Sequence, residues 1–299
     1  MSANPSDTRP RAAALSMLTG MAIIGAVDNT IAPLARDIGI WQFYFIRSLM
    51  SVPLILLAAW WGLGSVWPRR LWAVALRGGV IATAMVFYFG ALAVISLPQA
   101  LAGLFTSPIF VLLITAMVLG QKVGPWRIGA VAFGFLGILL VIEPWGDAPS
   151  VAMLMPVVGG FLYAFGVIAT RTICFGESVL SMLLALFVCQ GVIGLAALGV
   201  LGAAEGDFVT RGWVWPMAPL SWAILAVQAV GAVIGVGFLF RAYSLGDASY
   251  VTVFEYSVFV FGAFFAWLFF GELVSATAAI GIALICGAGI VIALRAPAD

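Results

Sequence analysis

The sequence predicts an all-α integral membrane protein, with ten transmembrane helices built as two inverted five-helix repeats around a central cavity. Of the 299 residues, 64% are hydrophobic and only 8% are charged, whereas a soluble domain carries about 25% charged residues. A membrane-spanning helix needs about 20 apolar residues, so the chain is long enough for ten crossings and their loops. This composition excludes a soluble enzyme. The net charge is +1 and no basic domain or tail is present, so nucleic acid is not an expected partner.

Short clusters of charged residues, proline and glycine separate the apolar runs and set the limits of the predicted helices. The ten helices are predicted at residues 12–35, 41–63, 71–94, 98–120, 126–143, 151–171, 178–203, 219–243, 248–270 and 275–294. Residues 12–147 form the predicted first repeat and residues 148–295 the second. Residues 1–11 and 296–299 are the predicted terminal tails.

Three features define individual elements. The first apolar run, residues 12–35, is too long for the h-region of a signal peptide, about 7 to 15 residues, so it is predicted to be the first transmembrane helix. Pro98 is predicted to restart the chain as the first turn of the fourth helix, because proline lacks the amide hydrogen that continues a helix. Trp213 and Trp215 indicate that the long connector between the seventh and eighth helices lies at the membrane interface.

The fifth and tenth predicted helices are rich in glycine. These glycines are Gly129, Gly134 and Gly137 in the fifth helix and Gly281, Gly287 and Gly289 in the tenth. Small residues let helix backbones approach closely in lipid, where van der Waals packing replaces the hydrophobic effect. We therefore expect both helices to be packing elements.

The distribution of basic residues predicts the orientation. If the N-terminus is cytoplasmic, the cytoplasmic side receives Arg9, Arg11, Arg69, Arg70, Arg77, Lys122, Arg127, Arg171, Arg241 and Arg295, and the other side receives only Arg36 and Arg211. Lys and Arg accumulate on the cytoplasmic side of membrane proteins. Both termini are therefore predicted to be cytoplasmic, in a multi-pass protein of the inner (plasma) membrane.

The two halves of the chain share a weak internal repeat. When residues 85–124 are moved forward by 151 positions, residues 87–91 (FYFGA) align with residues 238–242 (FLFRA), and Gly120-Gln121 aligns with Gly271-Glu272. With five helices in each half, the second copy must lie upside down relative to the first. Inverted repeats with a site near the midplane are typical of secondary transporters.

We single out three charged residues inside predicted spans: Asp28, Arg47 and Glu255. Each costs about 2.5 to 3.5 kcal/mol near a helix centre, so each is expected to have a partner or a function. Asp28 and Arg47 both lie about 10 Å from the outer ends of adjacent helices at 1.5 Å per residue, and we predict a charge pair. The pair either fixes helix packing or borders the outer vestibule and acts as a gate.

Glu255 allows two opposite behaviours. Burial favours a protonated carboxyl group, which serves as a proton site, whereas a nearby arginine such as Arg171 or Arg241 holds the group ionised. The chain contains no histidine. Any proton coupling must therefore run through carboxylates, of which Asp28 and Glu255 are the candidates, and a facilitator without coupling needs neither.

The sequence resembles the drug/metabolite transporter superfamily, in its ten-helix EamA-type branch, from about Ala12 to Arg295. The similar motifs are Asp28-Asn29-Thr30, Trp41-Gln42, Phe45-Ile46-Arg47, Thr106-Ser107-Pro108 followed by Gly120-Gln121, and Glu255-Tyr256 followed by Gly271-Glu272. Gln121 stands where these repeats often carry Glu. The resemblance implies an alternating-access transporter, most similar to exporters of aromatic or hydrophobic amino acids and related small metabolites. Uptake of a metabolite and efflux of multidrug or cationic compounds are the alternatives.

The resemblance also implies a central cavity formed by helices one, three, four, six, eight and nine. The predicted cavity residues are Asp28, Phe87, Tyr88, Thr106, Ser107, Pro108, Tyr163, Gln228 and Tyr256. Aromatic rings would hold an apolar side chain, while hydroxyls, amides and the carbonyl freed by Pro108 would hold a polar end. The expected partners are a small-molecule substrate and the lipid bilayer, and a monomer is expected.

Other functional classes fit the sequence less well. The chain has one lysine, three dispersed cysteines and no CxxC pair, so neither a catalytic constellation nor a metal site is expected. A channel would show a filter sequence or a ring of like charge, and a sensor would need no internal repeat. We therefore expect no enzyme activity, no cofactor and no metal.

Overall fold

The structure is a computed structural model that describes residues 10–117, 125–142, 151–245 and 254–294. Every regular element within these ranges is helical. The elements are α1 (Pro10–Asp28), α2 (Ile31–Asp37), α3 (Ile40–Trp60), α4 (Leu71–Ala91), α5 (Leu97–Leu104), α6 (Ser107–Met117), α7 (Pro125–Ile142), the 3₁₀ turn η2 (Val151–Leu154), α8 (Met155–Arg171), α9 (Val179–Leu201), α10 (Pro219–Leu245), α12 (Ser257–Phe270) and α13 (Ala276–Leu294).

Six of the described stretches are long and apolar enough to cross a membrane. They are Pro10–Asp37, Ile40–Trp60, Leu71–Ala91, Ala152–Thr170, Val179–Leu201 and Pro219–Leu239. Shorter apolar helices occupy Leu97–Val111, Ala132–Val141, Ser257–Phe270 and Ala276–Ala288. The helical, multi-pass character predicted from the sequence is therefore confirmed. That all ten stretches cross the membrane stays a prediction.

The first predicted helix, residues 12–35, is divided into α1 and α2. The Asn29 side-chain amide donates to the Gly25 carbonyl at 2.8 Å, and the Thr30 hydroxyl donates to the Val27 carbonyl at 2.6 Å. Such local hydrogen bonds offer backbone groups an alternative to the helical ladder. The chain therefore turns at residues 29–30 before α2 begins.

The fourth predicted helix, residues 98–120, is divided into α5 and α6 at Phe105 and Thr106. Pro108 has no amide hydrogen for the preceding turn and restricts the residue before it. The predicted restart near Pro98 is confirmed, because α5 begins at Leu97 with Pro98 in its first turn. The Gln99 side chain there accepts a hydrogen bond from the Ser96 amide at 3.3 Å, as in a capping box.

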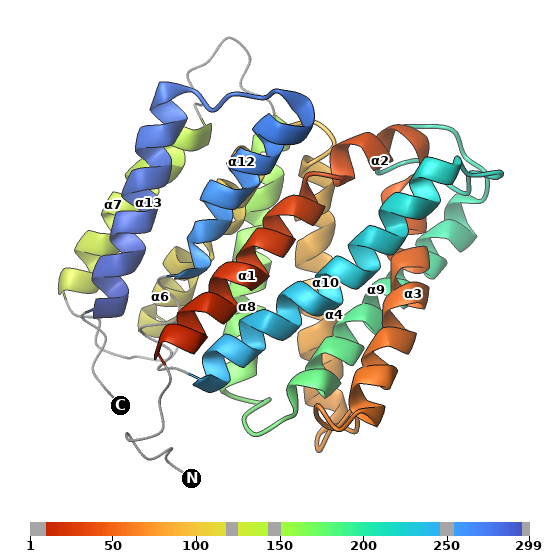
Figure 1. Cartoon of the computed structure of the whole chain (residues 1–299), viewed down its shortest axis with the longest axis horizontal. Coiled ribbons are helices and arrows are strands. Elements are labelled where there is room, and N and C mark those ends of the chain that lie inside the picture. Colours follow the sequence, from red (N-terminus) through yellow and green to blue (C-terminus); the bar gives the residue numbers. More distant parts are fainter. Residues whose placement is uncertain (1–9, 118–124, 143–150, 246–253, 295–299) are drawn as a thin grey trace.

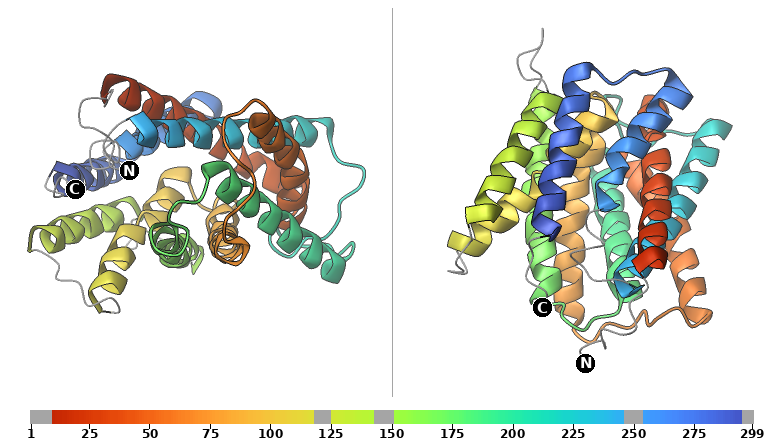
Figure 2. Two further views of the ribbon diagram at one scale, coloured as in Figure 1. Left: turned by 90° about the horizontal axis from the view of Figure 1, so that it is seen from below. Right: turned by 60° about the vertical axis from the view of Figure 1, so that its left-hand side comes forward.

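The helices run in two layers, which the left panel of Figure 2 shows from below. In one layer α1 lies between α10 and α12, and in the other α8 lies between α4 and the α5–α6 pair (Figure 1). α3 pairs with α9, and α7 pairs with α13 at one edge of the molecule. The start of α1 and the end of α13 lie at the same end of the molecule, whereas α2 and the connection between α12 and α13 lie at the opposite end (Figure 1).

The α7–α13 pair depends on glycine, as the sequence predicted. A Cβ atom at Gly137 would lie 2.7 Å from the Gly281 carbonyl oxygen, and a Cβ atom at Gly281 would lie 2.5 Å from the Gly137 carbonyl oxygen. Side chains essentially never approach backbone atoms this closely, so both positions require glycine. Gly129 and Gly287 have no such neighbours within 4 Å, so the glycine contact is confined to the middle of the pair.

Candidate functional site

Two helix breaks occupy equivalent positions in the weak internal repeat. At the break between α5 and α6, the Thr106 hydroxyl donates to the Gly103 carbonyl at 2.6 Å. Just before α12, the Ser257 hydroxyl donates to the Phe254 carbonyl, also at 2.6 Å. Ser257 lies 151 residues after Thr106, the same offset that aligns the two halves. The same local hydrogen bond therefore occurs at aligned positions of the weak internal repeat.

The two breaks meet through aromatic side chains. The Phe105 and Tyr256 rings, again 151 residues apart in the sequence, have centroids 5.6 Å apart. Phe105 also lies 5.1 Å from Phe259, measured between ring centroids. Tyr256 is 9% exposed and Phe259 is fully buried. These rings form an aromatic contact between the two halves of the chain.

The break between α1 and α2 carries the predicted residue Asp28. Its carboxylate accepts a hydrogen bond of 2.8 Å from the Tyr88 hydroxyl of α4, so two predicted cavity residues lie together. The side-chain amide of Asn29 donates to the Gly262 carbonyl at 3.0 Å and thereby joins α1 to α12. Both Asp28 and Asn29 are buried. This break therefore joins three helices that lie far apart in the sequence.

Gln228 links the same break to Arg47. Its side-chain amide donates to the Val27 carbonyl and, at 3.0 Å, to the Thr30 hydroxyl. Its carbonyl oxygen accepts from the Arg47 guanidinium at 3.5 Å, and the carbonyl oxygen of Gln190 accepts from Arg47 at 2.8 Å. Gln228, another predicted cavity residue, thus bridges α1 and α3. Arg47 interacts with Asp28 electrostatically, but its hydrogen bonds go to amides.

A second set of charged and polar residues comes from α4, α8 and the residues just before α12. The Tyr163 hydroxyl interacts electrostatically with Glu255 and with Arg77 of α4. The Arg77 guanidinium also donates to the Thr170 hydroxyl of α8 at 2.8 Å. Glu255 interacts with the neighbouring Tyr256 as well. Glu255 therefore interacts electrostatically with both predicted cavity residues, Tyr163 and Tyr256, and Arg77 interacts with Tyr163.

The remaining predicted cavity residues have separate environments. Phe87 is half-buried on α4, and its Cβ atom lies 3.5 Å from where a Cβ atom of Gly159 would be. Ser107 is buried at the start of α6. Pro108 follows it in α6, but its side chain lies outside the described residues.

Four residues with polar or aromatic side chains near these breaks or near Arg47 were not predicted from the sequence: Phe105, Gln190, Ser48 and Ser51. The offset of 151 residues places Phe105 opposite Tyr256 and was the available signal for that contact. Gln190 is a polar residue inside an apolar helix, which in a membrane marks a hydrogen-bonding partner. Nothing in the linear sequence pairs it with Arg47.

The connector between α9 and α10 covers the end of α3 opposite the termini. The Gln42 side chain donates to the Val214 carbonyl at 3.0 Å and accepts from the Val214 amide at 2.9 Å. The Trp41 indole donates to the Val209 carbonyl at 2.6 Å. The predicted interfacial connector is therefore tied to α3 by specific hydrogen bonds.

Gln42→Leu is expected to loosen this connector, because both backbone groups of Val214 lose their partner. An unpaired buried group costs about 1 to 3 kcal/mol. We expect faster proteolysis within residues 203–218 and a lower unfolding temperature in detergent. Gln42→Glu keeps the acceptor and should give an intermediate rate. Equal proteolysis rates for wild type and Gln42→Leu would show that the hydrogen bonds of Gln42 do not hold the connector.

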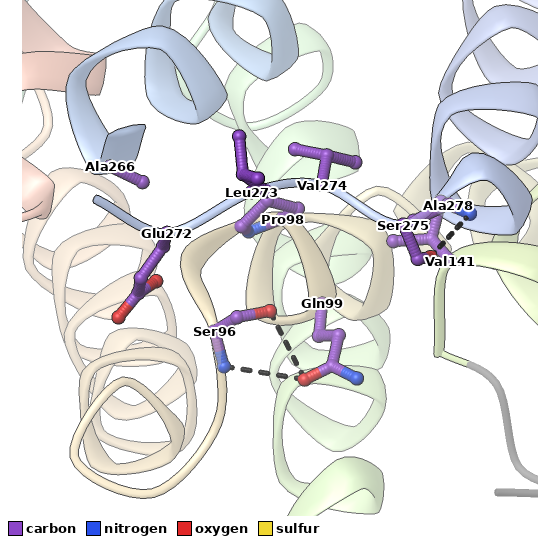
Figure 3. A pocket seen from close by; sticks show the side chains of 10 residues that line it. All are labelled: Ser96, Pro98, Gln99, Val141, Ala266, Glu272, Leu273, Val274, Ser275 and Ala278. Carbon is purple, nitrogen blue, oxygen red and sulfur yellow. Dashed lines mark hydrogen bonds between the residues drawn. The ribbon is translucent and has the colours of Figure 1, made fainter. Parts of the chain in front are cut away.

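A cavity of about 280 Å³ lies at the same end of the molecule. Figure 3 shows Ser96 and Gln99 of the first half on one side and residues 272–275 of the second half on the other. The polar lining groups are one carboxylate (Glu272), one amide and two hydroxyls. Both halves thus contribute to a polar recess at the end opposite the termini.

Within the described ranges, no group of three Cys, Asp or Glu residues is arranged to hold a metal ion. The chemistry available at the breaks is hydrogen bonding, charge and aromatic contact. These groups suit binding of a small solute.

Comparison with known families agrees with the resemblance. The model of the EamA-like transporter family matches residues 11–143. The matched stretch coincides with the predicted first repeat.

The chain is also similar to several curated transporters. It is 29% identical to the riboflavin transporter of Rhizobium johnstonii over 84% of this chain and 78% of the relative. It is 28% identical to the pseudopaline exporter of Pseudomonas aeruginosa over 70% of both chains. It is 22% identical to the S-adenosylmethionine uptake transporter of Rickettsia prowazekii over 79% of this chain and 75% of the relative.

A solved structure shares the fold of the chain. The TM-score is 0.67 at 20% sequence identity, and the match covers 95% of this chain and 97% of the other. The likeness concerns the fold alone. The structural similarity extends over both halves of the chain, whereas the family model matches only the first half.

Proposed function

We propose that the protein is an alternating-access transporter of a small amphipathic or zwitterionic metabolite, built from two inverted five-helix repeats. The observation that carries this proposal is the meeting of the two equivalent helix breaks at Phe105 and Tyr256. Broken helices at a repeat interface are where secondary transporters bind their substrates. The hydroxyls and freed carbonyls there supply polar groups, and the rings supply an apolar wall.

The directions of the helices support the inversion. In Figure 1, α1 and its counterpart α8 run in opposite directions, and so do α4 and α10, and α7 and α13. Contacts between α7 and α13 also occur in related pairs. Gly134 approaches Ala288, and Gly137 approaches Ile285. Ile285 lies 151 residues after Gly134, and Ala288 lies 151 residues after Gly137. Exchanging the two halves therefore converts the contact of Gly134 with Ala288 into the contact of Gly137 with Ile285.

We also propose that both termini are cytoplasmic and that the protein lies in the inner (plasma) membrane. The start of α4, with Arg69 and Arg70 just before it and Arg77 within it, lies at the end of the molecule where α1 begins (Figure 1). The opposite end holds α2, which contains Arg36, and Arg211 donates to the Arg36 carbonyl. The basic side chains thus gather at the end of the termini, as cytoplasmic segments do. The recess at Glu272 then becomes an outer vestibule.

The substrate class is best tested by counterflow in proteoliposomes. Riboflavin is the first solute to test, because of the similarity to riboflavin transporters, and aromatic and aliphatic amino acids are the second, because aromatic rings line the breaks. Loading each solute on either side distinguishes export from uptake. Absence of counterflow for every solute tested would contradict the proposed substrate classes.

Efflux of a cationic compound is the second candidate. The Asp28 carboxylate receives its hydrogen bond from Tyr88 and none from Arg47. A cation that binds this carboxylate therefore displaces no guanidinium hydrogen bond. Accumulation of a fluorescent cation in inside-out vesicles would favour this candidate over metabolite transport. A matched Asp28→Asn preparation should then lose the accumulation.

Proton coupling, if the transporter uses it, is proposed to run through Glu255. Glu255→Gln is expected to make the transport rate independent of an imposed pH gradient, because the amide cannot exchange a proton. Counterflow without a gradient should persist. An unchanged gradient response in Glu255→Gln would exclude this carboxylate as the proton site.

A further inference from the structure

Arg47 is a buried cation whose hydrogen bonds go to neutral groups. It is 3% exposed on α3, and its guanidinium carbon lies 4.4 Å from the ring centroid of Phe43 and 4.7 Å from that of Phe89. Its hydrogen-bond acceptors are the side-chain carbonyl oxygens of Gln190 and Gln228. Aromatic faces and amide oxygens stabilise a cation but do not neutralise it.

Three buried polar atoms around this position have no hydrogen-bond partner. They are the Nε atom of Arg47 and the hydroxyl oxygens of Ser48 and Ser51. Arg47 and Ser51 are one turn apart on α3 and share a face. Leaving such groups unpaired in a buried site is unfavourable. Three unpaired polar atoms on one turn of α3 indicate that these atoms bind a hydrogen-bonding group in another conformation of the protein.

In this conformation Asp28 interacts with Arg47 electrostatically but accepts no hydrogen bond from it. Asp28 accepts its hydrogen bond from Tyr88, and within the described residues no carboxylate accepts a hydrogen bond from Arg47. An ionisable residue inside a membrane span is costly and is retained for function. The unused Nε–H therefore points to an anionic ligand.

We propose that Arg47 binds the anionic group of the transported solute, a carboxylate or a phosphate. This inference rests on the proposed transport function and deepens it. The Nε–H and a terminal N–H of arginine form a parallel pair of donors that matches two anionic oxygens. Ser48 and Ser51 add hydroxyl donors, and the rings of Phe43 and Phe89 hold an aromatic or apolar part of the same solute.

The site is closed in this conformation, since the unpaired atoms are buried. Binding therefore requires α9 or α10 to move away from α3, which displaces the amides of Gln190 and Gln228. Alternating access supplies such a movement. Release of the solute returns Arg47 to the two amides.

The test measures binding of two matched ligand pairs to the full-length protein in detergent. L-phenylalanine and L-phenylalaninamide differ by a carboxylate, and flavin mononucleotide and riboflavin differ by a phosphate. Apparent Kd values come from the rise in unfolding temperature with ligand concentration. The wild type is expected to bind the anionic member of at least one pair about tenfold more tightly, as a charge-assisted hydrogen-bond pair allows.

Arg47→Gln should abolish this preference, and Arg47→Lys should leave a reduced one, because lysine keeps the charge without the paired donors. Arg36→Gln removes an equal charge from an exposed position and should keep the full preference. If Arg47→Gln does not fold, the anion preference of Arg47→Lys is compared with that of Arg36→Gln, and a weaker preference in Arg47→Lys supports the role of Arg47. The pair that shows the preference distinguishes a carboxylate from a phosphate.

The results for binding and transport separate the two proposals. Counterflow of a solute without any preference for anionic ligands, or with a preference that survives in both Arg47 variants, overturns the role of Arg47 and leaves the transport function standing. Absence of both binding and counterflow for every compound overturns the proposed function, and the role of Arg47 falls with it.

Discussion

Replacing Gly137 by leucine is expected to separate α7 from α13 and to lower the free energy of unfolding by about 3 kcal/mol, the upper range for overpacking. The Cβ atom alone would lie 2.7 Å from the Gly281 carbonyl oxygen, and backbone cannot rotate away as a side chain can. Lipid provides no hydrophobic drive to hold the helices together once close contact is lost. The effect is measured as the unfolding temperature in detergent, which is detected by the loss of monodisperse protein on heating.

The matched control lies in the same helix. A Cβ atom at Gly129 would have no neighbouring atom within 4 Å, so Gly129→Leu tests leucine in α7 without the collision. Its unfolding temperature should equal or exceed that of the wild type, because leucine favours helix over glycine. Equal destabilisation by both substitutions would contradict the assigned role of the glycine contact.

Neutralising either member of the Asp28 and Arg47 pair is expected to destabilise the protein more than neutralising both. Asp28→Asn leaves a buried guanidinium without its nearest interacting carboxylate, and Arg47→Gln leaves a buried carboxylate held by Tyr88. Loss of one charge from a buried pair costs about 3 to 5 kcal/mol at most. Because Asp28 and Arg47 interact without a shared hydrogen bond, we expect about 2 kcal/mol for each single variant.

The double variant Asp28→Asn/Arg47→Gln measures the coupling. A double-mutant cycle isolates the pairwise free energy, and we expect the double variant to be at least about 1 kcal/mol more stable than the sum of the single effects predicts. Additive effects would show that the two charges act independently. A stable double variant that no longer transports would favour the gating role over the packing role.

Much of the helical layout was predictable from composition and hydropathy. Each predicted helix has a counterpart among the described elements, within a few residues at most described ends, because an apolar run bounded by charge or proline has no other stable form in lipid. The predicted packing role of Gly137 and Gly281 was confirmed by the contact between α7 and α13. The predicted restart at Pro98 was confirmed because proline constrains its own backbone.

The helix breaks were less predictable, because side-chain hydroxyls there compete with backbone amides for the same carbonyl groups. Thr106 and Ser257 each donate to the carbonyl three residues before them, yet hydroxyls also occur inside continuous helices. At Thr30 the same bond occurs beside an amide from α10. The tertiary neighbours therefore decide whether such a residue ends a helix.

By itself, the sequence determined the class of the protein, the order of its helices and the three charges inside its spans, because the cost of exposing polar groups to lipid acts on every residue independently. The tertiary structure alone decided the partners of those charges. It placed Tyr88 on Asp28, Gln190 and Gln228 on Arg47, and Tyr163 near Glu255. These contacts join helices far apart in the chain, and only the packing of the two layers brings them within hydrogen-bonding or electrostatic range.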